Sequence, residues 1–295
     1  LMNPLVSIIL VNYNGYEDTV ECVRSLKEID YDNYEVIVVD NGSTTSPTDF
    51  QTSYLSDNTC FIRNEENLGF AGGNNVGIRL ALTHNPRYLL LLNNDTVVKK
   101  DFLSQLVEIA ESRSDVGIVC GKIYWFDEPD ILWYDGGAIN RETCITTHYN
   151  YNKIDDHKKN LEIKEITFAT GCMWLIPIQA QKIVGYLSEK YFLYAEDDDY
   201  CCRIIDAGLK IYYNPASVIY HKVSRSTGAT STNTQYYTAR NQLMIIHEFS
   251  TNKPKAYYCY LKRYVKKFLQ KSVDLKVICK AVMAALRGKQ GRRYM

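Results

Sequence analysis

The chain has 295 residues, of which 34 are basic and 34 acidic, and 46% are apolar. This length and composition are typical of one large α/β domain or two smaller ones. No run of about 18 apolar residues is present, which excludes a membrane-spanning helix. The nine cysteines form no C-x-x-C pair, and residues 1–11 lack the basic region of a secretory signal. We therefore expect a reduced, cytoplasmic compartment.

The zero net charge conceals an asymmetry between the body and the C-terminal segment. Residues 253–295 hold thirteen of the basic residues and a single acid, Asp274, which leaves 21 basic and 33 acidic residues in the body. A body this acidic is not typical of a nucleic-acid-binding protein. The basic segment interleaves Lys and Arg with Tyr, Phe, Leu and Val, which predicts an amphipathic helix for an anionic membrane surface. The alternative is a helix that caps the domain and exposes a solvated face.

In chain order, apolar runs alternate with helical spacing. Residues 6–11, 36–39, 60–62, 88–92 and 117–123 are predicted strands, and residues 16–29, 76–82 and 102–110 are predicted helices, with a polar glycine-bearing loop over 64–75. This alternation indicates an open, mostly parallel sheet, which binds ligands beyond the carboxyl ends of its strands. Because Asn12, Asp40, Asn67 and Asp95 follow strand ends, we expect a polar rim at one edge of the sheet.

The second half is less regular. Residues 124–170 are aromatic and hairpin-like, and 170–177 are a predicted strand. After the acidic helix, 210–213 and 217–220 are two predicted strands, and the second leads to His221. Residues 224–234 are rich in Ser, Thr and Gly and are predicted to be a mobile loop before a helix at 235–249.

Four acids stand side by side at Glu196, Asp197, Asp198 and Asp199, directly after an apolar run. A helix N-terminus accounts for one or two of them. Four adjacent carboxylates repel one another unless a cation, a phosphate-bearing substrate or a proton to be moved is close by. A dinucleotide-binding fold does not explain the cluster, because the turn after the first strand lacks G-x-G-x-x-G, and the P-loop pattern is absent as well.

Five motifs occur in order over residues 4–225. They are VSIILVNYN at 6–14, VVDNGS at 38–43, NLGFAGGNN at 67–75, LNND at 92–95 and EDDD at 196–199. Together they resemble the motifs of family 2 glycosyltransferases, in the branch of bacterial rhamnosyltransferases and galactofuranosyltransferases. The resemblance implies a GT-A fold, with a mostly parallel nucleotide-sugar-binding sheet flanked by helices. It also implies a nucleotide-sugar donor, a divalent metal and an inverting mechanism.

The resemblance assigns the donor side residue by residue. Asp40 matches the acid that binds the pyrimidine base, and the glycine-bearing segment matches the loop near the donor diphosphate; an ordinary strand-end turn and a flexible surface loop are the structural alternatives. The donor-binding residues implied in this way are Asn12, Asn14, Asp40, Asn67, Gly69, Gly72, Asn74, Asn93, Asn94 and Asp95.

A metal site is implied at Asp95 and His221. Asn93-Asn94-Asp95 replaces the Asp-x-Asp that the family commonly has, so only Asp95 keeps a carboxylate. His221 lies 24 residues beyond Asp197, where relatives place a metal-binding His, although a lone His is often structural. One carboxylate with donor diphosphate oxygens suits Mg²⁺ or Mn²⁺, and an imidazole ligand favours Mn²⁺.

By the same resemblance, Asp197 is the catalytic base and Glu196 supports it. Trp174 and Asp198 are placed on the acceptor side, with core packing as the alternative for Trp174. We expect a GT-A domain at 1–250, with a donor half to about 123 and an acceptor half from about 124, and a basic helical tail at 251–295 that docks on the inner face of the membrane rather than completing the active site.

The sequence therefore predicts an inverting, metal-dependent hexosyltransferase that moves a sugar, with L-rhamnose from dTDP-rhamnose preferred, to a cell-surface glycan or lipid-linked acceptor. A UDP-hexose or UDP-galactofuranose donor is the alternative. A catalytically weak sugar-nucleotide-binding scaffold is favoured only by the missing Asp-x-Asp. A nucleotidyltransferase lacks support, because its basic, glycine-rich signature is absent near the N-terminus.

Overall fold

The computed structural model describes residues 3–45, 58–157, 161–223 and 231–292. Within them, ten strands form one sheet in the order β10-β12-β6-β11-β4-β1-β2-β3, with β5 beside β12 and β7 beside β6, and β8 and β9 form a separate hairpin. The strands are β1 Val6–Asn12, β2 Tyr34–Asp40, β3 Thr59–Arg63, β4 Tyr88–Asn93, β5 Thr96–Val98, β6 Val116–Trp125, β7 Leu132–Tyr134, β8 Gly137–Asn140, β9 Ile145–His148, β10 Lys164–Ile166, β11 Met173–Pro177 and β12 Lys210–His221.

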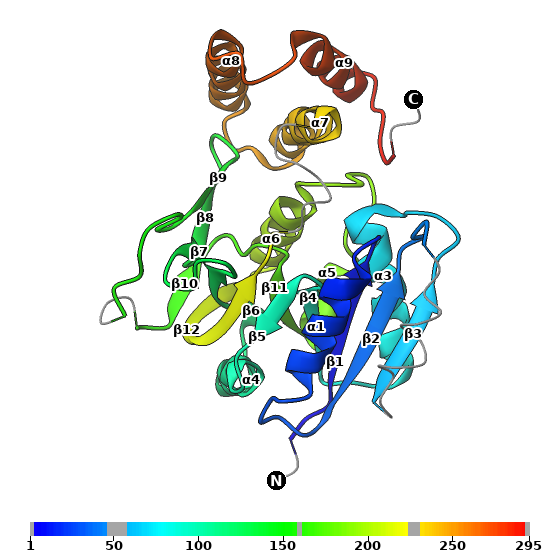
Figure 1. Cartoon of the computed structure of the whole chain (residues 1–295). Coiled ribbons are helices and arrows are strands. Elements are labelled where there is room, and N and C mark those ends of the chain that lie inside the picture. The colour runs from blue at the N-terminus through cyan, green and yellow to red at the C-terminus, as the bar shows by residue number, and fades with distance from the viewer. Residues whose placement is uncertain (1–2, 46–57, 158–160, 224–230, 293–295) are drawn as a thin grey trace.

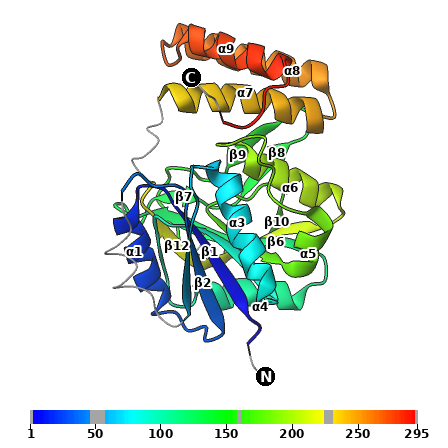
Figure 2. The same cartoon turned by 90° about the vertical axis from the view of Figure 1, so that its right-hand side faces the viewer.

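The N-terminal half of the sheet is parallel, as predicted. β1 pairs in parallel with β2 and β4, and β2 pairs in parallel with β3. Their continuous apolar runs are buried because helices cover both faces, and Figures 1 and 2 show α1 (Tyr16–Leu26) and α3 (Gly69–Thr83) on opposite sides of β1 and β2. β11 runs antiparallel between β4 and β6 and joins this half to the rest of the sheet.

The other helices cover the second half and one end of the molecule. They are α4 Phe102–Ser112, α5 Ile178–Val184, α6 Glu196–Asp206, α7 Thr232–Phe249, α8 Lys253–Leu269 and α9 Leu275–Leu286. Both views show α7, α8 and α9 as a layer at one end of the sheet, next to α6 and the β8–β9 hairpin. No helix within the described ranges is both long and apolar enough to cross a membrane.

Two local predictions were wrong. The sequence predicts a loop over 64–75, whereas α3 already begins at Gly69. Its glycines allow the helix to lie close to the sheet, because a Cβ on Gly77 would stand 2.5 Å from Ile9 Cγ2. The sequence also predicts two strands within 210–220, whereas β12 is one strand with an irregularity between Asn214 and Val218. Pro215 lies there and has no N–H to donate to the ladder.

Buried side chains hold the helices of the C-terminal layer together. Tyr260 and Tyr264 of α8 are each 7% exposed, their rings contact each other in a tilted arrangement with centroids 4.6 Å apart, and the Tyr260 hydroxyl donates to the carbonyl of Ala239 in α7. On α9, Val277, Ile278, Ala281 and Ala284 are buried. The predicted mobile loop lies mostly outside the described residues; α7 begins within its end, where the Ser231 side chain caps the helix by accepting from Thr234 N–H.

Candidate active site

Polar side chains meet at the carboxyl edge of the parallel strands, as predicted. The register places Asn12 at the end of β1 opposite Asp40 at the end of β2, and Val11 opposite Asn93 at the end of β4. The Asn12 amide donates to Asp40 Oδ1 over 3.1 Å. The topology thus brings three chain segments, separated by up to about eighty positions in the sequence, to one edge.

Asp40 is fully buried and has one oxygen that accepts no hydrogen bond within the described part of the chain. Its Oδ1 accepts from Asn12 and Ser43, whereas Oδ2 accepts no hydrogen bond from the described residues and has the Arg63 Nε at 3.4 Å; the Tyr16 side chain also interacts with this carboxylate. A buried acceptor without a donor is unfavourable. Oδ2 is therefore able to accept an N–H from a ligand, beside the partly exposed Arg63, whose Nη2 donates to the Ser43 carbonyl over 2.8 Å.

Two of the predicted donor residues position loops within the protein. The Asn12 amide oxygen accepts from Gly15 N–H and the Thr19 hydroxyl, so both ends of its side chain are used internally. Asn14 adopts a left-handed backbone with φ 56°, and its Oδ1 accepts from the N–H and hydroxyl of Thr44. These bonds hold the loops after β1 and β2 together.

The segment that begins α3 is held by Asn41, a residue that the sequence did not single out. Asn41 Nδ2 donates to Asn67 Oδ1 and to the Gly69 carbonyl, and Asn41 Oδ1 accepts from Leu68 N–H. Asn67 Oδ1 also accepts from Gly69 N–H over 2.8 Å. The sequence feature that could have identified Asn41 is its position directly after Asp40, at the end of a predicted strand.

The glycines at the start of α3 have a packing role. Gly69 has φ +76°, and a Cβ there would lie 2.1 Å from the Phe192 carbonyl oxygen; a Cβ on Gly72 would lie 2.6 Å from Leu68 Cβ. In this structure the two glycines permit close packing of protein against protein, and their approach to a donor diphosphate stays a prediction. Asn74 likewise donates to the Phe70 carbonyl, one turn earlier in the helix.

Asp95 and His221 form a buried pair beyond the strand ends. His221 Nε2 lies 3.0 Å from Asp95 Oδ1 and 3.3 Å from Asn93 Nδ2, and the Trp133 ring stands edge-on to the imidazole at 4.6 Å. Burial alone lowers the pKa of His221, but the neighbouring Cys172 and Asp95 outweigh it and raise the pKa to about 10. Asn94 instead donates to the Thr19 hydroxyl.

This pair fits part of a metal site. A carboxylate oxygen and an imidazole nitrogen at this separation are suitable ligands for Mn²⁺. No group of three His, Cys, Asp or Glu side chains within the described ranges is arranged to hold a metal ion. A cation bound here would therefore take its remaining ligands from water and a substrate.

Of the four acids at 196–199, one has a structural role and the other three form no ion pair among the described residues. Asp199 is buried and accepts from Arg203 Nε at 2.6 Å, Lys190 Nζ at 3.2 Å and the Tyr191 hydroxyl at 3.0 Å. Glu196, Asp197 and Asp198 have no ion pair among the residues that the structure describes. They begin α6, whose free N–H groups favour negative charge.

Burial raises the pKa of each of these three carboxyl groups. For Asp197 burial raises the pKa to about 6, opposed by main-chain N–H groups of Asp198, Gly171 and Asp197 itself. For Asp198 burial and the charge of Asp197 raise the pKa to about 8 despite the hydrogen bond from Thr146. Burial and Asp197 raise the pKa of Glu196 well above its ordinary value, and its Oε2 has no described partner. A carboxylate with a pKa near neutrality is suited to accept a proton.

A strained backbone presents these acids. Phe192, Tyr194 and Ala195 have φ of 66°, 66° and 72°, in the left-handed region that costs non-glycine residues free energy. The Asn241 amide on α7 donates to the carbonyls of Tyr191, Leu193 and Tyr194, at 3.1, 2.8 and 2.7 Å. Without these bonds we expect the segment to relax and the acids to move.

The acids open into a pocket of about 250 Å³ between α6, α7 and α8. Glu196, Asp197 and Asp198 line one side, with Gln242 of α7 and Arg263 of α8 among the other lining residues. Arg263 donates to Gln242 Oε1 over 3.2 Å, and its charge lowers the pKa of Asp198. The expectation that the tail does not complete the active site is therefore wrong, because α8 supplies a cation to this pocket.

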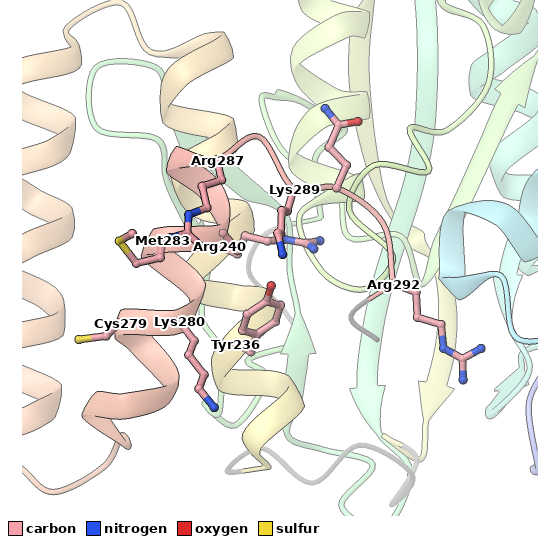
Figure 3. A pocket seen from close by; sticks show the side chains of 10 residues that line it. Tyr236, Arg240, Cys279, Lys280, Met283, Arg287, Lys289 and Arg292 are labelled. Carbon is pink, nitrogen blue, oxygen red and sulfur yellow. The ribbon is translucent and has the colours of Figure 1, made fainter. Parts of the chain in front are cut away.

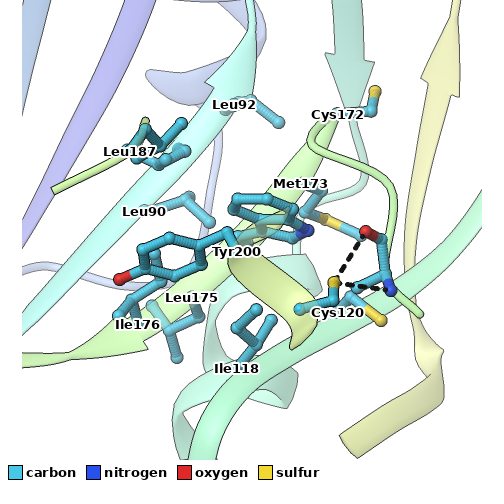
Figure 4. Packing of buried hydrophobic residues seen from close by; sticks show 14 of the residues in the cluster. Leu90, Leu92, Ile118, Cys120, Cys172, Met173, Leu175, Ile176, Leu187 and Tyr200 are labelled. Atoms are coloured by element: carbon cyan, nitrogen blue, oxygen red, sulfur yellow. Dashed lines mark hydrogen bonds between the residues drawn. The ribbon is translucent and has the colours of Figure 1, made fainter. Parts of the chain in front are cut away.

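The prediction that Trp174 contacts an acceptor also disagrees with the structure. Trp174 is fully buried and stacks on Tyr200 of α6 with ring centroids 5.4 Å apart. Figure 4 shows Tyr200 within a cluster that includes Leu90, Met173 and Leu175. The alternating strand pattern places the Trp174 side chain on a face that α6 covers, so it belongs to the core.

Comparison with known proteins decides the family. Residues 7–182 match the model of glycosyl transferase family 2. The chain belongs to this family. It is 26% identical over 301 residues to the low-salt glycan biosynthesis hexosyltransferase Agl10 of Haloferax volcanii, covering 97% of this chain and 92% of the relative. It is 25% identical over 222 residues to the rhamnosyltransferase WbbL of Escherichia coli, covering 72% and 81%.

Solved structures agree on a GT-A fold for this glycosyltransferase. GalNAc-T7 with UDP, GalNAc and Mn²⁺ superposes with a TM-score of 0.64 at 15% identity, over 83% of this chain and 51% of that one. The mannosyltransferase PcManGT of Pyrobaculum calidifontis with GDP-Man and Mn²⁺ gives 0.59 at 16% identity, over 97% and 76%. The chain thus spans about half the length of the GalNAc-T7 chain.

Burial of Asp198 predicts an unusual pH dependence of stability. Its folded pKa of about 8 exceeds the ordinary value of 3.8, so between these pH values the unfolded state binds fewer protons and stability falls as pH rises. Asp198→Asn removes this loss. We expect the variant to be more stable than the wild type in urea unfolding at pH 8, with the difference shrinking toward pH 4.

The neighbouring Asp199→Asn is the matched control. It removes a carboxylate that is paired with Lys190 and Arg203, so it should destabilise the protein at pH 8. If both substitutions destabilise the protein at pH 8, the charged form of Asp198 does not reduce the stability of the folded state, and the prediction is wrong.

Proposed function

We propose that the chain is an inverting glycosyltransferase that moves a hexose from a nucleotide-sugar donor to the hydroxyl of a cell-surface glycan or lipid-linked acceptor. The observation that carries this proposal is Asp197, an unpaired carboxylate with a pKa of about 6 that opens into the 250 Å³ pocket. The chain belongs to glycosyl transferase family 2, and Asp197 stands at the N-terminus of α6.

In this mechanism Asp197 accepts the proton of the acceptor hydroxyl as that oxygen attacks the anomeric carbon. Burial and the neighbouring Asp197 raise the pKa of Glu196 well above its ordinary value, so Glu196 favours its neutral form beside the base. Asp198 and Arg263 face the same pocket, and we assign them to the acceptor.

On the donor side, Asp40 Oδ2 would accept the N–H of a pyrimidine base, and Asp95 and His221 are the residues that would hold Mn²⁺ or Mg²⁺. When bound, the cation neutralises the leaving nucleoside diphosphate. To act as a ligand, His221 would have to give up the proton that Asp95 stabilises in the free protein.

The donor that we prefer is dTDP-rhamnose. The five motifs resemble those of rhamnosyltransferases, and the chain is similar to WbbL over most of both lengths. UDP-hexose and UDP-galactofuranose are the competing donors. A thermal-shift series with these sugars and Mn²⁺ separates them, because a ligand specific for the folded state raises the midpoint.

Asp197→Asn should abolish transfer and leave donor binding intact. Loss of a general base costs about 10²–10⁴ in rate, and the wild-type rate should rise with pH through about 6, where Asp197 loses its proton. Release of nucleoside diphosphate from the preferred donor is the measurement. Asp206→Asn, at the far end of α6, is the control and should retain activity. Turnover by Asp197→Asn at the wild-type rate would mean that another residue is the base. If the wild type binds the donor but shows no turnover, the protein is a scaffold.

Asp95→Ala and His221→Ala should each weaken metal-dependent donor binding. Calorimetry with nucleoside diphosphate, with and without Mn²⁺, measures this, and loss of one of several ligands should lower affinity by about ten-fold or more. His148→Ala is the control, since His148 also contacts Trp133, at 5.5 Å, but lies outside the Asp95 pair. If His221→Ala leaves the effect of Mn²⁺ unchanged, His221 is structural.

We also propose that α8 and α9 dock on an anionic membrane, which would place the protein at the inner face of the cell membrane. Apolar side chains are exposed between the lysines of these helices, among them Tyr258 at 65%, Leu261 at 61% and Leu269 at 75%. Near an anionic surface each Lys or Arg contributes about 1 kcal/mol before screening. The opposite faces of α8 and α9 pack against α7, so docking would leave this packed side undisturbed.

Flotation with phosphatidylserine vesicles tests this docking in the full chain. Lys262→Gln/Lys266→Gln/Lys271→Gln should reduce binding, and wild-type binding should fall as salt shortens the Debye length to about 8 Å. Lys27→Gln/Lys99→Gln/Lys153→Gln removes three exposed lysines elsewhere and should bind like the wild type. Equal loss in both variants, or no binding by the wild type, would contradict the proposal.

A further inference from the structure

A second, larger pocket of about 690 Å³ lies between α7 and the end of α9. Figure 3 shows the side chains of Tyr236 and Arg240 from α7 facing those of α9 and the segment after it. Five cations line this pocket, and none of its described lining residues is acidic: Arg240, Lys280, Arg287, Lys289 and Arg292.

The pocket is separate from the one that contains the acids. Tyr236 and Arg240 are four residues apart and share one face of α7, whereas Thr238 and Gln242 line the acidic pocket from another face of the same helix. The two pockets therefore flank α7, and the role of the second is not explained by the transfer reaction.

Arg240 is the buried end of this pocket. Its side chain is 1% exposed, and it donates to Asn241 Oδ1 and to the carbonyls of Lys190, Tyr191 and Gly291. These acceptors are neutral, and no described carboxylate pairs with Arg240. The rings of Tyr236 and Tyr237 lie 5.6 and 5.0 Å from the guanidinium. A buried cation without an anion is costly, and an anion in the pocket would relieve that cost.

The other cations strengthen this argument. Lys280, Arg287 and Lys289 form no ion pair within the described chain, and Arg292 alone pairs with Glu66, at 3.6 Å. Cations gathered around one space with low-dielectric walls raise the local potential and attract anions. Arginine forks and a lysine ammonium are together the groups that recognise phosphate oxygens.

We propose that the α7–α9 pocket binds a phosphate or diphosphate group. Two or more negative charges match a pocket with four cations that lack an anionic partner, and the volume leaves room for part of the molecule that carries the phosphate. This inference goes beyond the proposed transfer reaction and does not depend on it.

Calorimetry of the full chain with inorganic pyrophosphate in EDTA tests the site, since removal of divalent metal suppresses metal-dependent binding at the donor site. Arg287→Gln/Lys289→Gln should weaken binding by about ten-fold or more, because charge-assisted hydrogen bonds are lost. Lys280→Gln, from α9 itself, should weaken it independently. Arg240 is left in place because it supports the backbone before the acids.

Lys262→Gln/Lys276→Gln is the matched control, since it removes two exposed tail charges that do not line the pocket. It should bind pyrophosphate like the wild type. Absence of saturable binding by the wild type, or equal binding by Arg287→Gln/Lys289→Gln, would overturn the proposal.

Competition identifies the source of the phosphate. Vesicles with phosphatidic acid, which carries a phosphate monoester, should displace pyrophosphate more strongly than phosphatidylserine vesicles of equal charge if the natural ligand is a lipid head group. If neither kind of vesicle displaces it, the site takes a soluble phosphate. Equal displacement by both would mean that charge alone is recognised and would contradict a phosphate site.

Discussion

The site depends on one constraint: three carboxyl groups, of which Glu196 is buried and Asp197 and Asp198 are partly buried, lie together at the start of α6 without a direct ion pair among the described residues. The side chains of Glu196, Asp197 and Asp198 stay there because their segment is fixed from outside. Asn241 holds three carbonyls of the strained backbone before them. Ion pairs of Asp199 anchor the first turn of the helix. Burial then raises the pKa values that make proton transfer possible near neutral pH.

The sheet brings the predicted donor residues together by topology alone. Parallel strands end at one edge, so Asp40 and Asp95 reach the same region although neither contacts the other. Asp40 Oδ2 is buried and accepts no hydrogen bond among the described residues. Polar atoms of this kind are expected where a ligand supplies the missing partner.

Much of this arrangement was predictable from local patterns. Apolar runs that end in Asn or Asp gave the parallel strands and their polar edge, and the run of acids marked the N-terminus of α6. The packing role of the α3 glycines was missed, because glycine permits close approach by any neighbour, and only the fold shows that Gly69 faces the Phe192 carbonyl. Asn41, Asn241 and Arg263 were missed because their partners are distant in the sequence, so no local pattern reports them.

The dependence of the acids on α7 has a consequence for biosynthesis. Asn241 lies more than forty positions after the segment that it holds, so a chain still being synthesised can complete the sheet and expose the acids before α7 has left the ribosome. Domains generally fold as their residues emerge. The nascent enzyme would thus pass through a stage in which the carboxyl edge of the sheet has formed but Asp197 is not yet held in position. It would stay inactive until its C-terminal helices have folded.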